Sequence, residues 1–358
     1  MPTNGDFIQR HAEAVAIKND VTSIHIISDK NTKNFIDITD EIINEVRTII
    51  GYVKFTKNPF LKWLRFIIAF RKIYKKIDSF HVVHVNRIYP LGIFALYLKI
   101  FKKKLFIISE HWTGLLKEHG ATLTLFEKHI SKKIVKNAAF VCPVSQNLAD
   151  SMINLGFRGN YHVVPNVVDT KLFLPKHIIN NRFTLLHVSN MLDEHKNVSG
   201  ILYVAGELKK SIPNFRLILI GSESEKYTEQ IIELSLQDNV EIIPQIEHQK
   251  VVAFMQEADV FVLFSNYENL PCVILESFSC GLPVISSDVG GISEFFPANF
   301  GYLIPKKDTQ ILTEILLNFY NSNTEYNSSE MHQYVEDHFG RKVICETFSS
   351  CYHNTLNI

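Results

Sequence analysis

Residues 267–276 read YENLPCVILE, which places seven residues between Glu268 and Glu276. The run continues with a Gly-Leu-Pro turn, an apolar strand-like stretch and the pair Gly290-Gly291. The order is therefore acid, loop, apolar helix start, second acid, turn, strand and Gly-Gly loop. Such an order predicts a ligand site at the carboxyl ends of parallel strands in an α/β domain.

The segment between the two acids predicts an anion-binding helix start. Proline is favoured in a first helical turn, so a helix that starts at Pro271 would leave the backbone N–H groups of Asn269 and Leu270 free for a phosphate. Glu276 would lie further along that helix, where a carboxylate can accept hydrogen bonds from both hydroxyls of a ribose. Two exposed helix acids without a ligand are the alternative interpretation.

The composition is that of a globular chain without a marked net charge. With 358 residues and 46% hydrophobic side chains, the chain can bury two domain cores. Basic and acidic residues balance at 37 each, which gives no reason to expect a nucleic-acid partner. The five cysteines show no CxxC pair and no metal-ligand spacing with histidine, which favours reduced thiols in a cytoplasmic protein. No apolar run reaches the length of a membrane span.

Strand-like and helix-like segments alternate along both halves of the chain. This alternation predicts βαβ units and parallel sheets. The predicted strands lie at 21–28, 82–85, 105–108 and 139–143 in the first half and at 184–188, 216–220, 240–243, 260–264 and 284–286 in the second. Between the halves, the proline-containing segment 161–175 is interpreted as a linker between two domains.

One segment is strongly basic although the whole chain is neutral. Residues 54–76 contain eight Lys or Arg and no Asp or Glu, interleaved with apolar side chains that include Phe60 and Trp63. A basic amphipathic helix of this kind can lie on an anionic membrane surface. The alternative is a solvated helix whose apolar stripe packs on its own domain.

Lys196 lies in a loop that follows a predicted strand and precedes a predicted helix. A lysine in such a loop can place its ammonium group on a diphosphate. A plain surface lysine is an equally compatible interpretation of this residue taken alone.

Together these motifs resemble the family-4 glycosyltransferases of the GT-B fold. In the second half the resemblance rests on Ser189-Asn190, Lys196-Asn197, Ile220-Gly221, Glu268 with Glu276, Gly281-Leu282-Pro283-Val284 and Gly290-Gly291. In the first half it rests on NGDFIQRHAEA at 4–14, SEHWTG at 109–114, PVS at 143–145 and PNVVD at 165–169. The resemblance covers nearly the whole chain.

The resemblance implies an α/β fold of two Rossmann-like domains that face a cleft. We expect an N-terminal acceptor-side domain at 1–165, a C-terminal nucleotide-sugar-binding domain at 166–335, and a last helix within 336–358 that packs back on the first domain. Relatives usually begin with a strand and a Gly-containing loop that reaches the donor phosphate. Here only the run around Gly5 corresponds to that region, so we expect the first strand to be missing, through a late start or a truncated chain.

The resemblance also implies roles for single residues. Glu268 would face the donor sugar, Glu276 the ribose and Lys196 the diphosphate. His111 would be a cleft-facing histidine, with a packed histidine beside Trp112 as the alternative. The further donor contacts that the resemblance implies are Gly5, Asn190, Gly221, Asn269, Leu270, Gly290 and Gly291. For Gly290 and Gly291, a structural turn is the alternative interpretation. No metal or other cofactor is expected, since the lysine and the helix start would stabilise the charge.

Other polar residues are weaker candidates. Glu110 is one of them. Ser145 resembles a helix N-cap more than a nucleophile. His187 and His195 are expected to be structural or surface residues. Many relatives carry an arginine on the diphosphate where this chain has Asn190. Either the leaving group is held less strongly here, or another cation such as Arg158 replaces that arginine.

The implied function is transfer of a sugar from a UDP- or GDP-linked donor to an acceptor hydroxyl, with retention at the anomeric carbon. A glycan or lipid-linked acceptor in surface polysaccharide or glycolipid assembly is expected, with the protein in the cytoplasm, either free or at the inner face of the membrane. The alternatives are a GT-B sugar-nucleotide epimerase and a subunit that binds nucleotide-sugar without catalysis. Domain closure is expected, with a hinge near 165–175.

Overall fold

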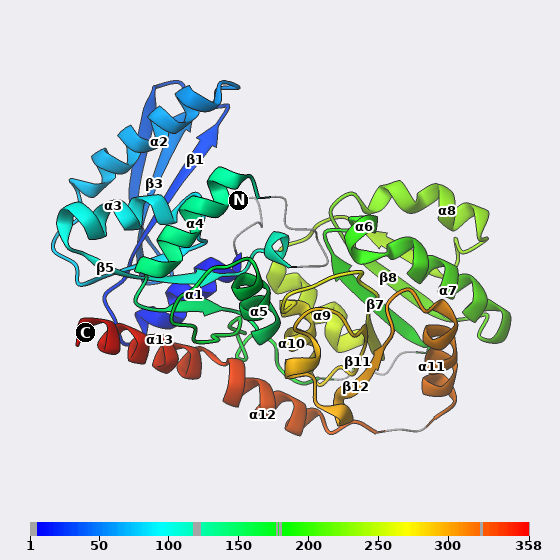
Figure 1. The fold of residues 1–358 in the computed structure, drawn as a ribbon. Coiled ribbons are helices and arrows are strands. Elements are labelled where there is room, and N and C mark those ends of the chain that lie inside the picture. Colours follow the sequence, from blue (N-terminus) through cyan, green and yellow to red (C-terminus); the bar gives the residue numbers. More distant parts are fainter. Residues whose placement is uncertain (1–5, 117–122, 177, 179–180, 323–324, 358) are drawn as a thin grey trace.

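The computed structural model describes residues 6–116, 123–176, 178, 181–322 and 325–357. The first half forms two three-stranded sheets with helices on their faces (Figure 1). Its helices are α1 (Asp6–Ala16), α2 (Pro59–Tyr74), α3 (Gly92–Lys102), α4 (Leu125–Asn137) and α5 (Gln146–Asn154). Its strands are β1 (Thr22–Asp29), β2 (Ile36–Ile43), β3 (Val46–Lys54), β4 (Val82–Asn86), β5 (Leu105–Glu110) and β6 (Val141–Pro143).

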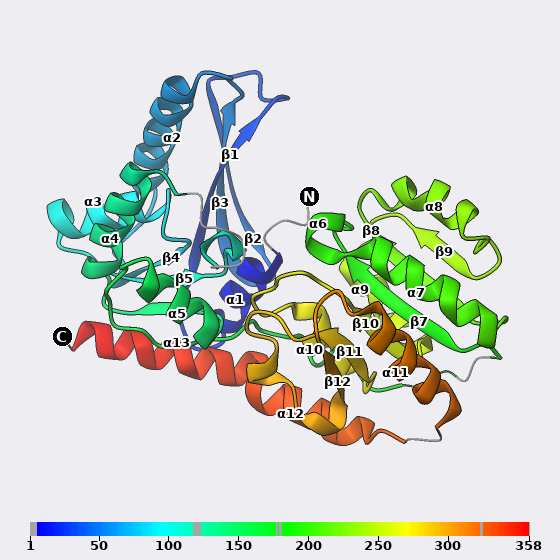
Figure 2. The same ribbon diagram turned by 45° about the vertical axis from the view of Figure 1, so that its right-hand side comes forward.

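The two sheets of the first half differ in strand direction. In the order β1-β3-β2, β3 runs parallel to β1 and antiparallel to β2, and this sheet with α2 projects away from the rest of the domain (Figure 2). The sheet β4-β5-β6 is parallel throughout. The loops after β4 and β5 therefore emerge at one edge, facing the second domain.

The second half forms one parallel sheet in the order β12-β11-β10-β7-β8-β9. Its strands are β7 (Thr184–Ser189), β8 (Arg216–Gly221), β9 (Val240–Ile243), β10 (Val260–Leu263), β11 (Val284–Ser287) and β12 (Gly301–Ile304). Its helices are α6 (Asp193–Lys196), α7 (Val198–Ser211), α8 (Thr228–Glu233), α9 (His248–Glu257), α10 (Cys272–Ser279) and α11 (Thr309–Asn321). The strand order reverses beside β7, and ligands of such sheets bind at the carboxyl ends of the strands at that point.

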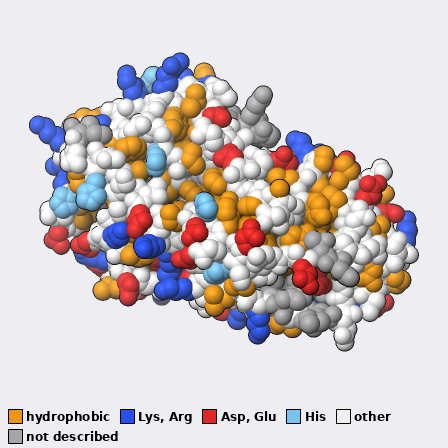
Figure 3. Space-filling model, turned by 90° about the horizontal axis from the view of Figure 1, so that it is seen from below, with side chains coloured by type: hydrophobic (Ala, Val, Ile, Leu, Met, Phe, Trp, Pro, Cys, Tyr) orange, Lys and Arg blue, Asp and Glu red, His pale blue; other side chains and the backbone are white. Residues whose placement is uncertain are grey.

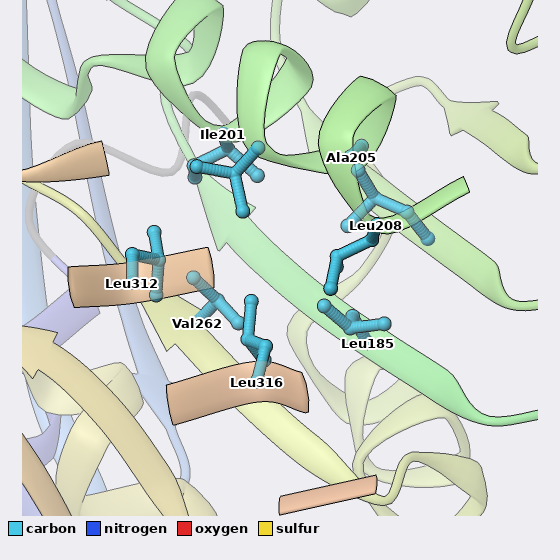
Figure 4. A pocket seen from close by; sticks show the side chains of 9 residues that line it. Leu185, Ile201, Ala205, Leu208, Val262, Leu312 and Leu316 are labelled. Carbon is cyan, nitrogen blue, oxygen red and sulfur yellow. The ribbon is translucent and has the colours of Figure 1, made fainter. Parts of the chain in front are cut away.

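The strands of the second sheet are continuous apolar runs, as expected for a sheet covered on both faces. A packing gap inside this core lies between α7, α11 and the strands beneath them (Figure 4). The side chains that line it are all apolar: Leu185, Ile201, Val204, Ala205, Leu208, Leu217, Val262, Leu312 and Leu316. The gap has no space for a water molecule, so it belongs to the core and is not a ligand site.

The chain ends in helices that return to the first domain. After α12 (Ser328–Phe339), α13 (Arg341–Leu356) packs on α1 and on β4 and β5, with Ile344 and Phe348 buried there. Arg341 Nη2 donates a hydrogen bond to Asp169 Oδ2 at 2.7 Å, which ties this helix to the linker. On the face seen from below, side chains of both charge signs are interspersed with apolar ones (Figure 3).

The fold confirms the predicted α/β class with two Rossmann-like domains, and each predicted strand is present. The strands β2 and β3 were not predicted. They form a hairpin whose turn residues Asn44 and Glu45 have φ angles of 47° and 67°. This is the left-handed geometry of a two-residue hairpin turn, here without the glycine that usually marks it. No residue of β2 is buried, so the strand lacks the alternation of buried and exposed side chains by which a strand is predicted.

Candidate functional site

Glu268 is buried at the end of the loop that follows β10, with 4% of its surface exposed. Lys196, the last residue of α6, donates a hydrogen bond from Nζ to Glu268 Oε1. Ser265 Oγ donates to the same oxygen at 2.7 Å, and His195 Nε2 lies 3.5 Å from it. Burial would raise the pKa of Glu268, but Lys196 and His195 outweigh it and lower the pKa to about 2. The carboxylate is therefore ionised near neutral pH.

The two loops meet because β7 and β10 are neighbours in the sheet. One turn of helix after β7 brings Lys196 over the end of β10, and Asn197 ends this turn in the left-handed conformation at φ 51°. The ring of His195 stacks on Tyr267, with 4.3 Å between ring centroids and 4° between planes. This contact fixes the two loops against each other beside the buried ion pair.

Glu276 forms a second buried cluster, on α10, with 1% of its surface exposed. Arg10 of α1 donates from Nη1 to Glu276 Oε1 at 2.6 Å, across the boundary between the two domains. His248 Nε2, at the start of α9, lies 2.9 Å from the same oxygen. Burial would raise the pKa of Glu276, but Arg10 and His248 outweigh it and lower the pKa to about 2. Both glutamates of the opening motif are thus carboxylates that only accept hydrogen bonds.

His111 follows β5 and faces the Glu268 loop from the first domain. Its Nδ1 lies 3.2 Å from Asn166 Oδ1, and its backbone oxygen accepts a hydrogen bond from Asn269 Nδ2 at 2.7 Å. The rings of Phe7 and His11 lie 4.6 and 5.2 Å from the His111 ring. Burial lowers the pKa of His111 well below its ordinary value, and the neighbouring His11 lowers it further. The imidazole is therefore neutral near neutral pH.

A further contact joins the domains beside this site. The carboxylate of Glu294, after β11, accepts the backbone N–H groups of Gln146 at 2.6 Å and Asn147 at 2.7 Å. These are the first residues of α5, where an acceptor with negative charge stabilises the helix terminus. Ser145 caps the same helix through Leu148 N at 3.1 Å, which confirms its predicted role as N-cap.

Three of the predicted site glycines, Gly221, Gly290 and Gly291, lie where the backbone closely approaches another segment of the chain. At Gly290, φ is +62° and an added Cβ would lie 1.7 Å from Glu268 O. At Gly291 an added Cβ would lie 2.5 Å from Ser145 Cβ, and at Gly221 it would lie 1.9 Å from Ser189 O. These glycines therefore shape the loops around Glu268 and at the end of β8.

One expectation about the helix start needs correction. The helix α10 begins at Cys272 with Pro271 as its N-cap, so Pro271 lies just outside the first helical turn. Asn269 and Leu270 precede this cap and contact the other side of the domain boundary through groups other than their backbone N–H: Asn269 Nδ2 donates to His111 O, and Leu270 O accepts from Asn166 Nδ2 at 2.7 Å. Proline marked the helix terminus correctly but stands at its cap instead of inside the first turn.

Other predicted residues have different surroundings. Asn190 is exposed, and its Oδ1 accepts from Leu192 N at 3.3 Å within its own loop. Arg158 is exposed after α5. Arg10, by contrast, contacts the buried carboxylate of Glu276. Gly5 lies outside the described residues.

Two further polar residues support the loops. Glu110 is buried and accepts the backbone N–H groups of Ile88, His111 and Trp112 at 2.9 to 3.0 Å. Burial raises the pKa of Glu110, although these donors oppose the rise. His187 is held between Val262 O and Ser189 Oγ, each at 2.8 Å, as the predicted structural role requires.

Four residues at the site were not singled out from the sequence: Arg10, Asn166, His248 and Ser265. Arg10 and Asn166 lie inside the quoted motifs at 4–14 and 165–169, so a signal for them existed. Nothing in the sequence marks His248 or Ser265 as neighbours of the two glutamates. Among the described residues, no three His, Cys, Asp or Glu side chains gather in a way that could hold a metal ion.

Family models match both halves of the chain. The model described as Glycosyl transferases group 1 matches residues 169–336, and the model described as Glycosyltransferase Family 4 matches residues 23–172. The chain belongs to the family-4 glycosyltransferases of the GT-B fold. The resemblance inferred from the sequence is thereby confirmed, and it spans both domains.

Curated members of the family-4 glycosyltransferases share moderate identity with the chain. "Putative glycosyltransferase EpsF" of Bacillus subtilis is 27% identical over 257 residues, which cover 66% of this chain and 65% of that protein. "Amylovoran biosynthesis glycosyltransferase AmsK" of Erwinia amylovora is 31% identical over 136 residues, which cover 35% of this chain and 33% of that protein. The match thus spans less than two thirds of the length of each relative.

Solved GT-B structures share the fold over most of the chain. Sucrose-phosphate synthase from Thermosynechococcus elongatus superposes with a TM-score of 0.82 at 21% identity, covering 99% of this chain and 94% of that one. Anabaena HepE in complex with UDP-glucose superposes with a TM-score of 0.69 at 18% identity, covering 84% and 85%. At these identities the likeness establishes the GT-B architecture of this glycosyltransferase chain.

Proposed function

We propose that the protein is a retaining hexosyltransferase that moves a sugar from a UDP- or GDP-linked donor to an acceptor hydroxyl. The observation that carries the proposal is the pair of buried, ionised carboxylates, Glu268 and Glu276, on either side of the α10 start. Lys196 contacts one of them, and His111 approaches their loop from the first domain. Structures of the same fold that are titled as UDP and UDP-glucose complexes support a nucleotide-sugar donor.

Each group has a chemical task in this proposal. An ionised Glu276 accepts both ribose hydroxyls, and Arg10 and His248 keep it ionised while no ribose is bound. The ammonium of Lys196 has three N–H donors, so one can remain on Glu268 while the others bind the diphosphate. Glu268 then accepts hydrogen bonds from hydroxyls of the donor sugar.

The reaction proceeds on the face from which the diphosphate leaves. The acceptor oxygen bonds to the anomeric carbon as the bond from that carbon to the phosphate oxygen breaks. The departing phosphate oxygen takes the acceptor proton, so atoms and charge balance without an enzyme nucleophile. Lys196 stabilises the charge on the leaving group, and the neutral His111 accepts a hydrogen bond from a sugar or acceptor hydroxyl.

The acceptor is proposed to be a glycan or a lipid-linked glycan at the cytoplasmic face of a membrane, in surface polysaccharide or glycolipid assembly. In the basic helix α2, Ala69 and Ile73 are buried against the first domain. Phe60, at the start of the helix, is 75% exposed, and Leu61, Leu64 and Ile67 are each 41% exposed. These exposed apolar side chains could insert into the interfacial region of an anionic membrane. No helix in the described part of the chain has the length and apolar character needed to cross a bilayer.

A thermal-shift screen with UDP-, GDP- and ADP-sugars tests the proposal, with Glu276→Gln as the matched control. One donor class should raise the melting temperature of the wild type and leave that of the variant nearly unchanged. Transfer is then assayed with that donor and extracted lipid-linked glycans. Donor turnover without any acceptor would identify an epimerase, and binding without transfer in all acceptor mixtures would identify a non-catalytic subunit. Either result would overturn the proposal.

A further inference from the structure

We propose that Asn166 is a positioning residue that fixes the tautomer of His111 and joins it to the Glu268 loop. The inference rests on the proposed function, because it concerns how His111 meets a hydroxyl. Asn166 lies in the linker between the domains, directly after Pro165, and only 6% of its surface is exposed. Its side chain contacts His111 of the first domain and Leu270 of the second.

The orientation of the Asn166 amide follows from its partner in the second domain. The partner is the backbone oxygen of Leu270, which can only accept a hydrogen bond, so the group 2.7 Å from it must be the Nδ2 amide. The Oδ1 atom then faces His111 Nδ1 at 3.2 Å. Since Oδ1 can only accept, the proton of the neutral imidazole must lie on Nδ1.

The other ring nitrogen is consequently a bare acceptor. His111 Nε2 is buried and has no hydrogen-bond partner among the described residues. Among the described residues, the titratable ring of His11 in α1 lies 5.2 Å from the His111 ring, and the electrostatic influence of both His11 and His84 of β4 lowers the pKa of His111. A hydroxyl that enters the cleft can therefore donate to Nε2, which would be impossible in the opposite tautomer.

A second amide crosses the same boundary in the opposite direction. Asn269 Nδ2 donates to His111 O at 2.7 Å, while Asn166 Nδ2 donates to Leu270 O at 2.7 Å. Asn269 and Leu270 follow Glu268 directly, so the four groups link His111 to the loop that carries this carboxylate. The imidazole is held in its accepting orientation when this loop is docked on the linker. Through Asn166, the orientation of the His111 ring thus depends on whether the two domains are closed against each other.

The test uses the whole chain with Asn166→Leu and Asn166→Asp, and Asn239→Ala as the control. Asn239 is also a buried asparagine that donates to backbone oxygens, those of Pro213 and Phe215 at 2.9 and 3.0 Å, but it lies within the second domain. In the ¹⁵N spectrum of the histidine-labelled wild type, the His111 resonances are identified by their absence from the spectrum of His111→Gln. Their chemical shifts should show a protonated Nδ1 and an unprotonated Nε2. This readout needs no donor and no activity, so it can fail independently of the proposed function.

In Asn166→Leu we expect both His111 tautomers to be populated and kcat to fall at least tenfold, with little change in the donor KM. In Asn166→Asp the added carboxylate should keep the proton on Nδ1 and stabilise the protonated imidazole. The acid limb of the pH–rate profile of kcat should therefore shift to higher pH. Asn239→Ala should lose stability without either effect. A wild-type His111 protonated on Nε2, or an Asn166→Leu variant with unchanged tautomer and kcat, would overturn the inference.

Discussion

The substitution Lys196→Met removes the ammonium group from a carboxylate that is almost completely buried. Glu268 keeps Ser265 and His195 as neighbours but loses the cation that most strongly offsets its desolvation. Breaking a buried ion pair by removing one partner costs about 3–5 kcal/mol. Because two polar neighbours remain, we expect a loss near the lower end, about 3 kcal/mol in the free energy of unfolding. The pKa of Glu268 should rise in the variant, since burial then dominates.

Urea unfolding of the wild type, Lys196→Met, and the double variant Lys196→Met/Glu268→Met measures this effect. An apolar pair of similar volume avoids the buried unpaired charge, so the double variant should regain most of the lost stability. Lys210→Met is the matched control, because Lys210 forms an exposed pair with Glu207 and such pairs contribute about 0–1 kcal/mol. A loss below about 1 kcal/mol in Lys196→Met, or a double variant less stable than this single one, would refute the argument.

The same variants separate stability from catalysis. If Lys196 stabilises the leaving diphosphate, its removal should lower kcat by about 10²–10³-fold, the cost of losing one contact to developing charge. The double variant should remain equally inactive although its stability returns. Wild-type turnover by the folded double variant would show that the ion pair has only a structural role.

Three further predictions concern acid stability, a loop glycine and the membrane surface. Burial lowers the pKa of His11 from 6.5 to about 4, so below about pH 6.5 the unfolded chain binds a proton that the folded chain does not. As the pH falls, this residue should therefore reduce the free energy of unfolding by about 1 kcal/mol per pH unit. Urea unfolding at several pH values should show a weaker dependence of stability on pH in His11→Gln than in the wild type. Gly290→Ala should cost about 2 kcal/mol or more in the free energy of unfolding, because its Cβ would meet Glu268 O. The control Gly206→Ala in α7 should not destabilise, since its Cβ would lie 3.6 Å from Leu234 Cδ2, an ordinary contact. Equal melting temperatures for both variants would contradict this. In a flotation assay with anionic vesicles, Phe60→Glu should lose most of the binding of the wild type, and undiminished binding would remove α2 from the proposed membrane surface.

The sequence predicted the fold well because long apolar strands alternate with amphipathic helices. It also predicted that residues near Lys196 and Glu268 lie in loops at one edge of a sheet, and the structure brings these two side chains into contact. The prediction worked because loops after neighbouring parallel strands must emerge together. The hairpin β2–β3 escaped prediction because its two-residue turn lacks glycine and no residue of its first strand is buried.

The partners of Glu276 could not be predicted in the same way. Arg10 is 266 residues away in sequence, and nothing local marks it as the partner of a buried carboxylate. Asn166 likewise acts through bonds to two different domains, which depend on how the domains face each other. Such contacts are set by the packing of whole domains, so the sequence pattern of one segment does not contain them.

The central claim is that Glu276 binds the ribose of a nucleotide-sugar. Its most direct test is a calorimetric comparison of one nucleotide with and without its ribose hydroxyls. The nucleoside diphosphate found in the donor screen and its 2′,3′-dideoxy analogue are titrated into the wild type and into Glu276→Gln. We predict that the wild type binds the ribonucleotide at least tenfold more tightly than the analogue, because two hydrogen bonds to an ionised acceptor are lost. The variant should bind both with nearly equal, weaker affinity. Equal binding of both nucleotides by the wild type would contradict the assignment of Glu276 and the nucleotide site built on it.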